Sequence, residues 1–543
     1  VEGTVIDECA TSFGIRSTRF DAEEGFLLNG KRVQLKGVCL HHDLGALGAA
    51  VNVRAMQRRL EILQDMGCNA IRTSHNPPAP ELLDLTDRMG FLVIDEAFDE
   101  WRVGKVGNGY HTLFEEWAER DLRDLIRRDR NHPSVILYSI GNEVRDQATP
   151  EGREIAEWLT SICHEEDPTR PVTAAFNNSE DAIANGLAAA VDVPGWNYKP
   201  HRYAHYHVEH PTWPMYGSET ESCVSSRGEY YVPVVEERDH RRETLHVTSY
   251  DVAAPPWGYS PEYEFAALEE CSAIAGEFVW TGFDYLGEPT PYKTEWPSRS
   301  AYFGILDLAG FPKDRYYLYR SRWSDEPTVH LFPHWNWPGH EGEIIPVHCY
   351  TSFAAAELFV NSRSVGRKER GTAPRPSVRA TVGQMELLDR YRFRWEVPYE
   401  PGEVSVVVYD ESGARAEAAT VRTAGAPARL ELSADRTAIA ADGRDLCFVS
   451  VFVVDAAGSV CPHADNAIRF AVEGPGRLVA TDNGDQTSLV PFPSSVRQAF
   501  HGRCLAIVAA DPGKDPGTIT ISATALEGVA AAGTAAAVRT EPR

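Results

Sequence analysis

Two glutamates are candidates for acid and base chemistry, because each lies at the end of an apolar run. Glu143 comes three residues after the run Val135–Ile140, and Glu219 is the last residue of the run Pro214–Glu219. A protonated carboxyl can donate a proton, and an ionised one can attack a carbon or activate water. Two such groups on opposite sides of an anomeric carbon are what the hydrolysis of a glycosidic bond requires.

Other polar and aromatic side chains close further apolar runs. A single polar residue at the end of a strand is as well explained by a capped loop. A whole set on one rim is not, since each buried polar group costs about 1–3 kcal/mol if it has no partner. The set that we expect to bind substrate beside the two glutamates is His41, Asp43, Arg72, His75, Asn142, Tyr198 and Trp280.

Eight short apolar runs supply the elements that would position these residues. They are Val33–Leu40, Ala70–Ser74, Phe91–Ile94, Val135–Ile140, Val172–Phe176, Val191–Asn197, Pro214–Glu219 and Phe278–Phe283. Amphipathic helices separate the early runs, as the apolar spacing of Met56, Leu60 and Leu63 indicates. The pattern predicts a (β/α)8 TIM barrel whose active site lies at the carboxyl ends of the strands. Strands four and seven face each other there, so the two carboxyls are expected at about 5–5.5 Å, the retaining separation.

Beyond the barrel the pattern alternates with a period of two, which is typical of β-structure. The fold class is therefore α/β plus all-β, a barrel followed by two immunoglobulin-like β-sandwiches. We place a remnant of an immunoglobulin-like domain at 1–24, the barrel at 25–322, a β-sandwich at 323–424 and a second one at 425–543. Within the remnant, Phe13–Arg16 is strand-like.

Composition narrows the function classes. The net charge of −26 disfavours nucleic acid and anionic membrane surfaces as partners. No apolar run approaches the roughly 18 residues that a membrane span needs. The ten cysteines form no CxxC pair, which indicates buried reduced thiols and favours the cytoplasm. The 12 tryptophans suit sugar stacking as well as they suit ordinary cores.

Several motifs, in order along the chain, resemble those of glycoside hydrolase family 2. Ser139–Glu143 resembles the acid/base motif of that family, and Gly217–Thr220 resembles its nucleophile strand. Ile71–Pro77, with Asp95-Glu96 after it, resembles another family signature, and Phe278–Trp280 the eighth strand. The segment Leu331–His340 is similar to the β-domain that follows the barrel in many bacterial β-galactosidases, so a retaining exo-β-galactosidase is the implied function.

The resemblance also implies a role for most site residues. Glu143 would be the acid/base and Glu219 the nucleophile. Asn142 would bind the sugar 2-hydroxyl, and Tyr198 would donate to the nucleophile. Arg72 would keep that nucleophile ionised. The terminal sugar would be lined by His41, His75 and Trp280.

This sequence departs from the family pattern at three places. The N-terminal sugar-binding sandwich and most of the domain after it have no counterpart, so we expect a folded chain with weakened sugar binding that self-associates as a homo-oligomer. Arg102 stands where some relatives have a magnesium-binding histidine, so we expect no metal and no cofactor. The Asn-x-Lys that marks β-glucuronidases after strand eight is missing, because no Asn lies between Trp280 and Lys313.

Two alternatives remain open at this point. One is the same chemistry on another sugar: a glucuronide, a mannoside or a glucosaminide. The other is a truncated chain that binds glycans without turning them over. Carbohydrate is the partner in every case.

Overall fold

A computed structural model describes residues 7–8, 13–234, 242–372, 385–529 and 533–541. The chain divides into two compact units. The first comprises Val1–His42, Asn69–Glu219 and Glu270–Phe278, and the second comprises Asp43–Cys68, Thr220–Glu269 and Val279–Arg543.

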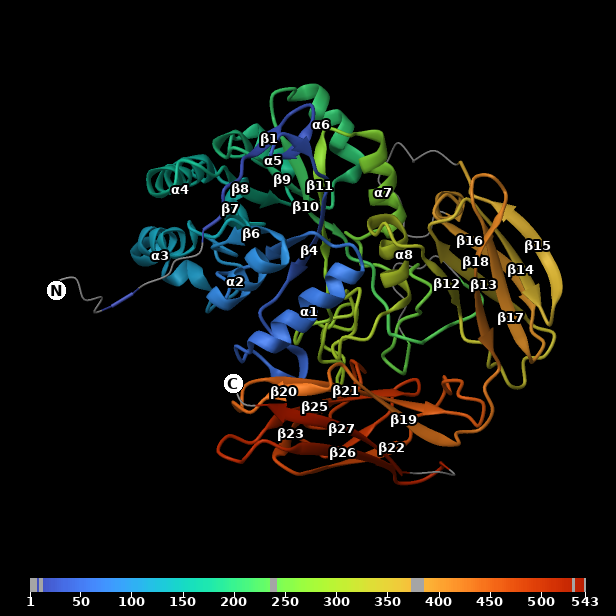
Figure 1. The fold of residues 1–543 in the computed structure, drawn as a ribbon. Coiled ribbons are helices and arrows are strands. Elements are labelled where there is room, and N and C mark those ends of the chain that lie inside the picture. Colours follow the sequence, from blue (N-terminus) through green and yellow to red (C-terminus); the bar gives the residue numbers. More distant parts are fainter. Residues whose placement is uncertain (1–6, 9–12, 235–241, 373–384, 530–532, 542–543) are drawn as a thin grey trace. The chain divides into compact units, whose positions relative to one another are not determined.

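Eight strands form a closed barrel in the order β10-β11-β4-β5-β6-β7-β8-β9 (Figure 1), which confirms the predicted TIM barrel. The strands belong to the first unit except for the last residues of β10 and β11. Their bounds are β4 (Leu35–Leu40), β5 (Ala70–Thr73), β6 (Leu92–Glu96), β7 (Val135–Asn142), β8 (Val172–Phe176), β9 (Gly195–Asn197), β10 (Met215–Glu221) and β11 (Ile274–Trp280).

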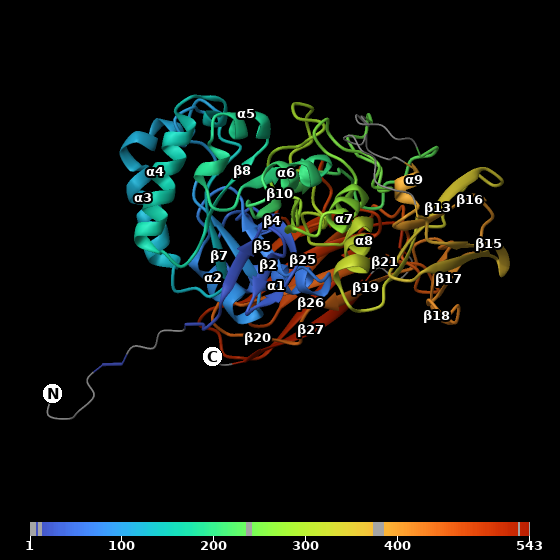
Figure 2. The ribbon, with the colours of Figure 1, turned by 90° about the horizontal axis from the view of Figure 1, so that it is seen from above.

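The barrel strands read as continuous apolar runs because both of their faces are covered. Every residue of β7 is buried, as is every residue of β5, β6 and β8. Helices of the first unit are α2 (Pro80–Met89), α3 (Phe114–Asp129), α4 (Gly152–Glu166), α5 (Ser179–Ala184) and α6 (Tyr203–Glu209). Helices α3 and α4 lie side by side in both views (Figures 1 and 2).

Three expected strands differ from the structure. The sixth barrel strand begins at Gly195, four residues after the predicted Val191. The eighth barrel strand begins at Ile274, four residues before the predicted Phe278, and ends at Trp280 instead of Phe283. Gly276 interrupts the apolar run, so the sequence pattern does not indicate this start. The strand nevertheless requires a glycine there, because its φ is +146° and a Cβ would lie 2.1 Å from the carbonyl oxygen of Leu35. Phe13–Arg16 is not a strand, and Ile15 is 93% exposed.

A short hairpin precedes the barrel. Strands β1 (Thr18–Asp21), β2 (Gly25–Leu28) and β3 (Lys31–Arg32) form one antiparallel sheet. The turn between β2 and β3 is Asn29-Gly30, with both residues in the left-handed region as Asn-Gly turns require. The predicted boundary at residue 24 falls in the turn between β1 and β2.

The second unit holds four β-sheets and the helices α1 (Val53–Asp65), α8 (Asp314–Trp323), α9 (Met385–Leu388) and nearly all of α7 (Pro261–Glu270). The first two sheets share a core that includes Trp335 and Trp395. They are built from β12 (Val329–Phe332), β13 (Ile344–Thr351) and β16 (Arg392–Pro398), and from β14 (Ala355–Val360), β15 (Arg363–Glu369), β17 (Glu403–Tyr409) and β18 (Arg415–Arg422).

The last two sheets enclose a separate core around Val451 and Ile521. One contains β19 (Arg429–Ala434), β21 (Leu446–Val454), β23 (Gly476–Asp482) and β25 (Arg503–Ala510). The other contains β20 (Ala438–Ala440), β22 (Ala467–Glu473), β24 (Val496–Gln498), β26 (Thr518–Ala525) and β27 (Gly533–Glu541). Two β-rich regions thus follow the barrel, as the period of two predicted.

The cysteines in the described part of the chain are all buried and without disulfides. Within those same residues, no helix combines the length and the apolar character that crossing a membrane demands.

Candidate active site

The carboxyl ends of the barrel strands bring most of the predicted site residues together. Parallel strands end at one rim, so side chains at or just beyond their last residues converge there. Members of the first unit in this cluster are Arg72 of β5 and His75 after it, Glu96 of β6, Asn142 and Glu143 at β7, Asn197 and Tyr198 at β9, and Glu219 of β10.

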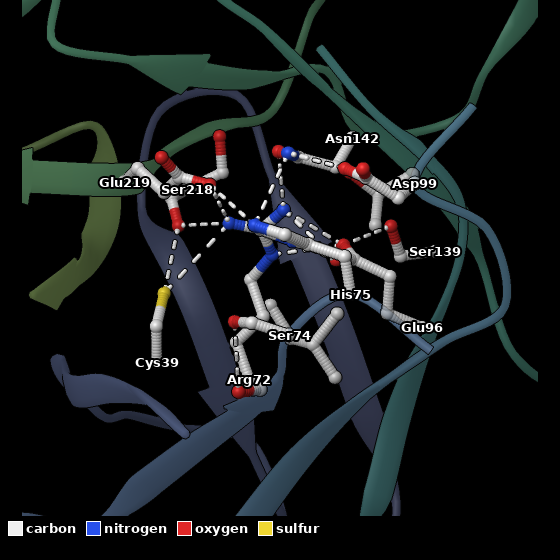
Figure 3. Close-up of polar contacts among 12 residues, drawn as sticks. Cys39, Arg72, Ser74, His75, Glu96, Asp99, Ser139, Asn142, Ser218 and Glu219 are labelled. Carbon is white, nitrogen blue, oxygen red and sulfur yellow. Dashed lines mark hydrogen bonds and ion pairs between the residues drawn. The ribbon is translucent and has the colours of Figure 1, made fainter. Parts of the chain in front are cut away.

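Arg72 is the centre of the cluster (Figure 3). Its Nη1 donates to Oε1 of Glu219 at 3.0 Å, and its Nη2 donates to Oδ1 of Asn142 at 2.9 Å. Its Nε donates to Oε2 of Glu96 at 2.9 Å. Burial opposes a charge here, but the two carboxylates outweigh it and raise the pKa of Arg72. The guanidinium is therefore a fixed cation that orients three partners at once.

Glu96 is a buried carboxylate at the end of β6 and is not among the predicted site residues. It accepts hydrogen bonds from Nδ1 of His75 and from Oγ of Ser139, each at 2.7 Å. Burial alone would raise its pKa, but Arg72 and His75 lower it to about 2. Glu96 closes an apolar run, as Glu143 and Glu219 do, and that signal could have found it.

Glu219 is held by donors on both of its oxygens. Arg72 occupies Oε1, and the hydroxyl of Tyr198 donates to Oε2 at 2.9 Å. His75 Nε2 lies 3.5 Å from Oε1. The carboxylate is 4% exposed, so an adjacent cation and two hydrogen bonds are what a buried negative charge needs. The arrangement fixes the direction of the carboxylate.

Glu143 sits in a different environment. Its Oε1 accepts from Nδ2 of Asn197 and its Oε2 from Nδ2 of Asn177, each at 2.9 Å. Burial and then the negative charge of Glu219 raise the pKa of Glu143 to about 7. A carboxyl with that pKa is partly protonated at neutral pH and can give or take a proton. Neither asparagine is among the predicted site residues.

The backbone at two of these positions is unusual. Glu143 has a φ of +43° and Tyr198 a φ of +58°, which few residues other than glycine adopt. Such conformations cost about 1–3 kcal/mol and concentrate at functional sites. Both residues directly follow a barrel strand, so the backbone changes direction where each of these two strands ends.

The remaining predicted site residues are His41, Asp43 and Trp280. His41 meets His75 edge-on, with 6.2 Å between ring centroids. Asp43 and Trp280 belong to the second unit, where Asp43 accepts from the amide of Leu286 at 3.4 Å and Trp280 packs edge-on against Tyr285. Their place beside a sugar stays a prediction.

In a continuing strand Glu221 would lie on the same face as Glu219, because the two are two positions apart. The structure contradicts this. Glu221 has a φ of +72°, which interrupts the alternation of the strand, and its side chain is fully buried within the second unit. There it accepts from Nη1 of Arg315 at 3.0 Å, and burial raises its pKa to about 8.

The stretch after β6 is organised by hydrogen bonds. Glu100 accepts from the backbone amide and Nδ1 of His111, at 3.0 and 2.9 Å, and from the amide of Lys105. Arg102 pairs with Glu115 at the surface. In the part of the chain that is described, no group of three His, Cys, Asp or Glu side chains is arranged to hold a metal ion.

A barrel of eight parallel strands with two rim carboxyls, followed by β-sandwiches, defines a class of glycosidase-like folds. Comparisons with known proteins give the family. The description "Glycosyl hydrolases family 2, TIM barrel domain" matches residues 22–219, and "Glycoside hydrolase family 2 C-terminal domain 5" matches residues 430–532. A domain of unknown function, DUF4982, matches residues 342–417.

Individual relatives agree with this assignment. "Beta-galactosidase BoGH2A" of Bacteroides ovatus is 43% identical over 96% of this chain and 63% of its own length. A solved "glycosyl hydrolase family 2 (GH2) member" from Bacteroides cellulosilyticus is 34% identical, with a TM-score of 0.84 over 100% of this chain and 67% of its own. A "Beta-glucuronidase" of Bacteroides fragilis is 28% identical over 68% of this chain and 53% of its own length.

The chain belongs to glycoside hydrolase family 2, as the motifs predicted. It spans less than two thirds of the length of the Bacteroides ovatus and Bacteroides fragilis relatives.

Proposed function

We propose that this chain carries the catalytic site of a retaining exo-β-galactosidase, with Glu219 as nucleophile and Glu143 as acid/base. The observation that carries the proposal is the contrast between the two carboxyls. The two oxygens of Glu219 accept hydrogen bonds from Arg72 and Tyr198. The pKa of Glu143, in contrast, is raised to about 7 by burial and by the charge of Glu219. Pairs of carboxyls with opposed environments divide the acid and nucleophile roles in glycosidases.

In the first step an oxygen of Glu219 attacks the anomeric carbon while the bond to the leaving oxygen breaks. Glu143 gives its proton to that oxygen, and a glycosyl ester with Glu219 remains. Forming the ester removes the negative charge of Glu219. Because that charge helps to raise the pKa of Glu143, its loss lowers the pKa and makes Glu143 a better base.

In the second step Glu143 takes a proton from water, and the water oxygen attacks the anomeric carbon. The bond to Glu219 breaks, which returns the carboxylate and releases a sugar of retained configuration. Arg72 and Tyr198 receive the returning charge in the geometry they already hold. This cycle needs no Lewis acid.

Asn142 is suited to bind the sugar 2-hydroxyl. Its Oδ1 already accepts from Arg72 at 2.9 Å and from Asn197 at 3.3 Å. Its Nδ2 lies 3.2 Å from both Nε2 of His75 and Oδ1 of Asp99, long contacts that a sugar oxygen could replace. The amide thus offers a donor on the side away from the arginine.

Galactose is the sugar that the comparisons favour. The Bacteroides ovatus relative is named a β-galactosidase and matches nearly the whole chain, while the match to the β-glucuronidase of Bacteroides fragilis is shorter and weaker. The missing Asn-x-Lys after strand eight also argues against a glucuronide.

A panel of nitrophenyl β-glycosides tests the proposal. Galactoside should give the highest kcat/KM, and Glu219→Gln should abolish turnover of every substrate in the panel. A preference for glucuronide, mannoside or glucosaminide would overturn the assignment of the sugar. Binding of galactose without turnover of any glycoside would overturn the enzyme and favour a glycan-binding chain.

A further inference from the structure

The second compact unit contains a cleft that the proposed chemistry does not use. Its volume is about 510 Å³, within the range typical of small-molecule sites. Segments far apart in the sequence line it: the 227–230 loop, α8, β12, β18, the 459–462 turn after β21 and the start of β25. No residue of the catalytic cluster is among its walls.

The walls of this cleft carry an excess of positive charge. Three arginines, Arg227, Arg422 and Arg503, line it, against one carboxylate, Asp314. In a chain of net charge −26, such a local excess is unexpected. Asp314 is already occupied, because Tyr230 donates to its Oδ2 at 2.7 Å and His330 lies 2.7 Å from its Oδ1.

Arg503 has no anionic partner among the described residues. Its guanidinium makes no hydrogen bond or ion pair with any of them, and its Nε is buried. The carbon at the centre of the guanidinium lies 5.8 Å from the centre of the Phe452 ring. Burial and the nearby Arg227 lower the pKa of Arg503, and Asp307, which is paired with Arg227, only partly opposes them. Arg503 is half-buried, and a partly desolvated guanidinium without a protein anion is stabilised by an anionic ligand.

Arg227 and Arg422 differ from Arg503 in having protein partners. Nε of Arg227 pairs with Asp307 at 2.6 Å, and its Nη2 donates to the carbonyl of Asn483 at 2.8 Å. Arg422 pairs with Glu403 at 2.8 Å, and its side chain is 60% exposed. Both add positive potential to the cleft, but of the three guanidinium groups only that of Arg503 has no hydrogen bond or ion pair to the described residues.

Neutral donors and flat rings complete the walls. The pKa of His334 is lowered to about 3 by burial and by its neighbours His463 and His501, so its ring is neutral at pH 7. Tyr317 stacks on His330, with 3.9 Å between ring centroids and 13° between planes. Aromatic walls beside hydrogen-bond donors fit a sugar ring better than a bare ion.

We propose that this cleft binds an oxyanion, a carboxylate or sulfate group, with Arg503 as its principal ligand. A guanidinium offers two parallel N–H donors that match such groups. The oxyanion can be free or carried on a saccharide, and the aromatic walls favour the saccharide.

Calorimetric titration of the full chain at low salt tests this. Three ligands are compared: sodium sulfate, a sulfated disaccharide and the same disaccharide without sulfate. We expect the sulfated sugar to bind, the neutral one not to bind detectably, and affinity to fall as salt screens the charges. Tighter binding of the sulfated sugar than of inorganic sulfate supports a saccharide ligand, and equal binding supports a free oxyanion.

Variants assign the binding to this cleft. Arg503→Gln should weaken it at least tenfold, as loss of a charge-assisted contact does. Arg422→Gln, at an exposed position where folding is not at risk, should weaken it a few-fold. Arg469→Gln, an exposed arginine of β22 outside the cleft, is the matched control and should bind normally. Unchanged binding in both cleft variants, or no binding of either anionic ligand, would overturn the proposal.

Discussion

The hydrogen bond from Asn197 to Glu143 gives a direct way to move the pH profile of the proposed enzyme. Asn197 Nδ2 donates to Oε1 of Glu143 at 2.9 Å and favours the ionised form of that carboxyl. Asn197→Ala removes the bond, so the pKa of Glu143 should rise from about 7. Because the acid must be protonated for the first step, the basic limb of kcat/KM should move to higher pH.

The size of the movement follows from the kind of bond that is lost. A hydrogen bond to a charged group contributes about 1.5–3 kcal/mol. A protonated carboxyl keeps part of that bond, so the difference between the two forms lies near the lower end. Since one pKa unit corresponds to ~1.4 kcal/mol, the basic limb should move up by about one unit.

The assay is the pH dependence of kcat/KM on an alkyl β-galactoside, whose poor leaving group requires the acid. Asn197 also accepts from Ser218 at 2.6 Å, so the plateau rate is expected to fall, and the position of the limb is the informative quantity. Asn178→Ala is the matched control, because Asn178 binds Asp181 and not Glu143. A basic limb that stays in place or moves to lower pH would refute the reasoning.

Three further predictions follow from the same contacts. Glu143→Ala should keep much of its activity on dinitrophenyl galactosides, which need no protonation, and lose it on alkyl galactosides; equal losses on both would remove the acid role. Arg315→Met should lower the free energy of unfolding by about 3–5 kcal/mol, measured in urea, because it leaves the buried Glu221 unpaired, and a loss below about 1 kcal/mol would contradict this. Activity should survive EDTA, because Arg102 stands at the position of the magnesium-binding histidine of some relatives. The oxygens of the neighbouring Glu100 already accept three hydrogen bonds, and a loss of activity that magnesium restores would reveal a metal site.

The barrel could be predicted from the sequence because parallel strands buried on both faces leave continuous apolar runs. Val172–Phe176 was predicted to the residue, and the other early strands within a few positions. The predicted bounds of the eighth strand are wrong because Gly276 and Glu277 interrupt its apolar run. The glycine allows the neighbouring backbone to approach closely. Periodicity reports side-chain hydrophobicity and says nothing of backbone contacts.

The candidate site was predictable where a residue closes a strand and unpredictable where its role depends on a partner. Arg72 and Tyr198 contact Glu219 as the family resemblance implied. Glu96 also closes a strand, so its position was recognisable, but its role and that of Asn177 depend on their bonds to Arg72 and Glu143. The two-residue spacing of Glu219 and Glu221 does not place them on one face, because a positive φ at Glu221 breaks the alternation of the strand.

Trapping the glycosyl intermediate tests the central claim most directly. A 2-deoxy-2-fluoro-β-galactoside with a good leaving group should inactivate the chain and leave one sugar attached. Mass spectrometry of the digested protein should place that sugar on Glu219. A label on Glu221 or Glu277, or turnover without any trapped ester, would contradict the assignment of Glu219 as the nucleophile.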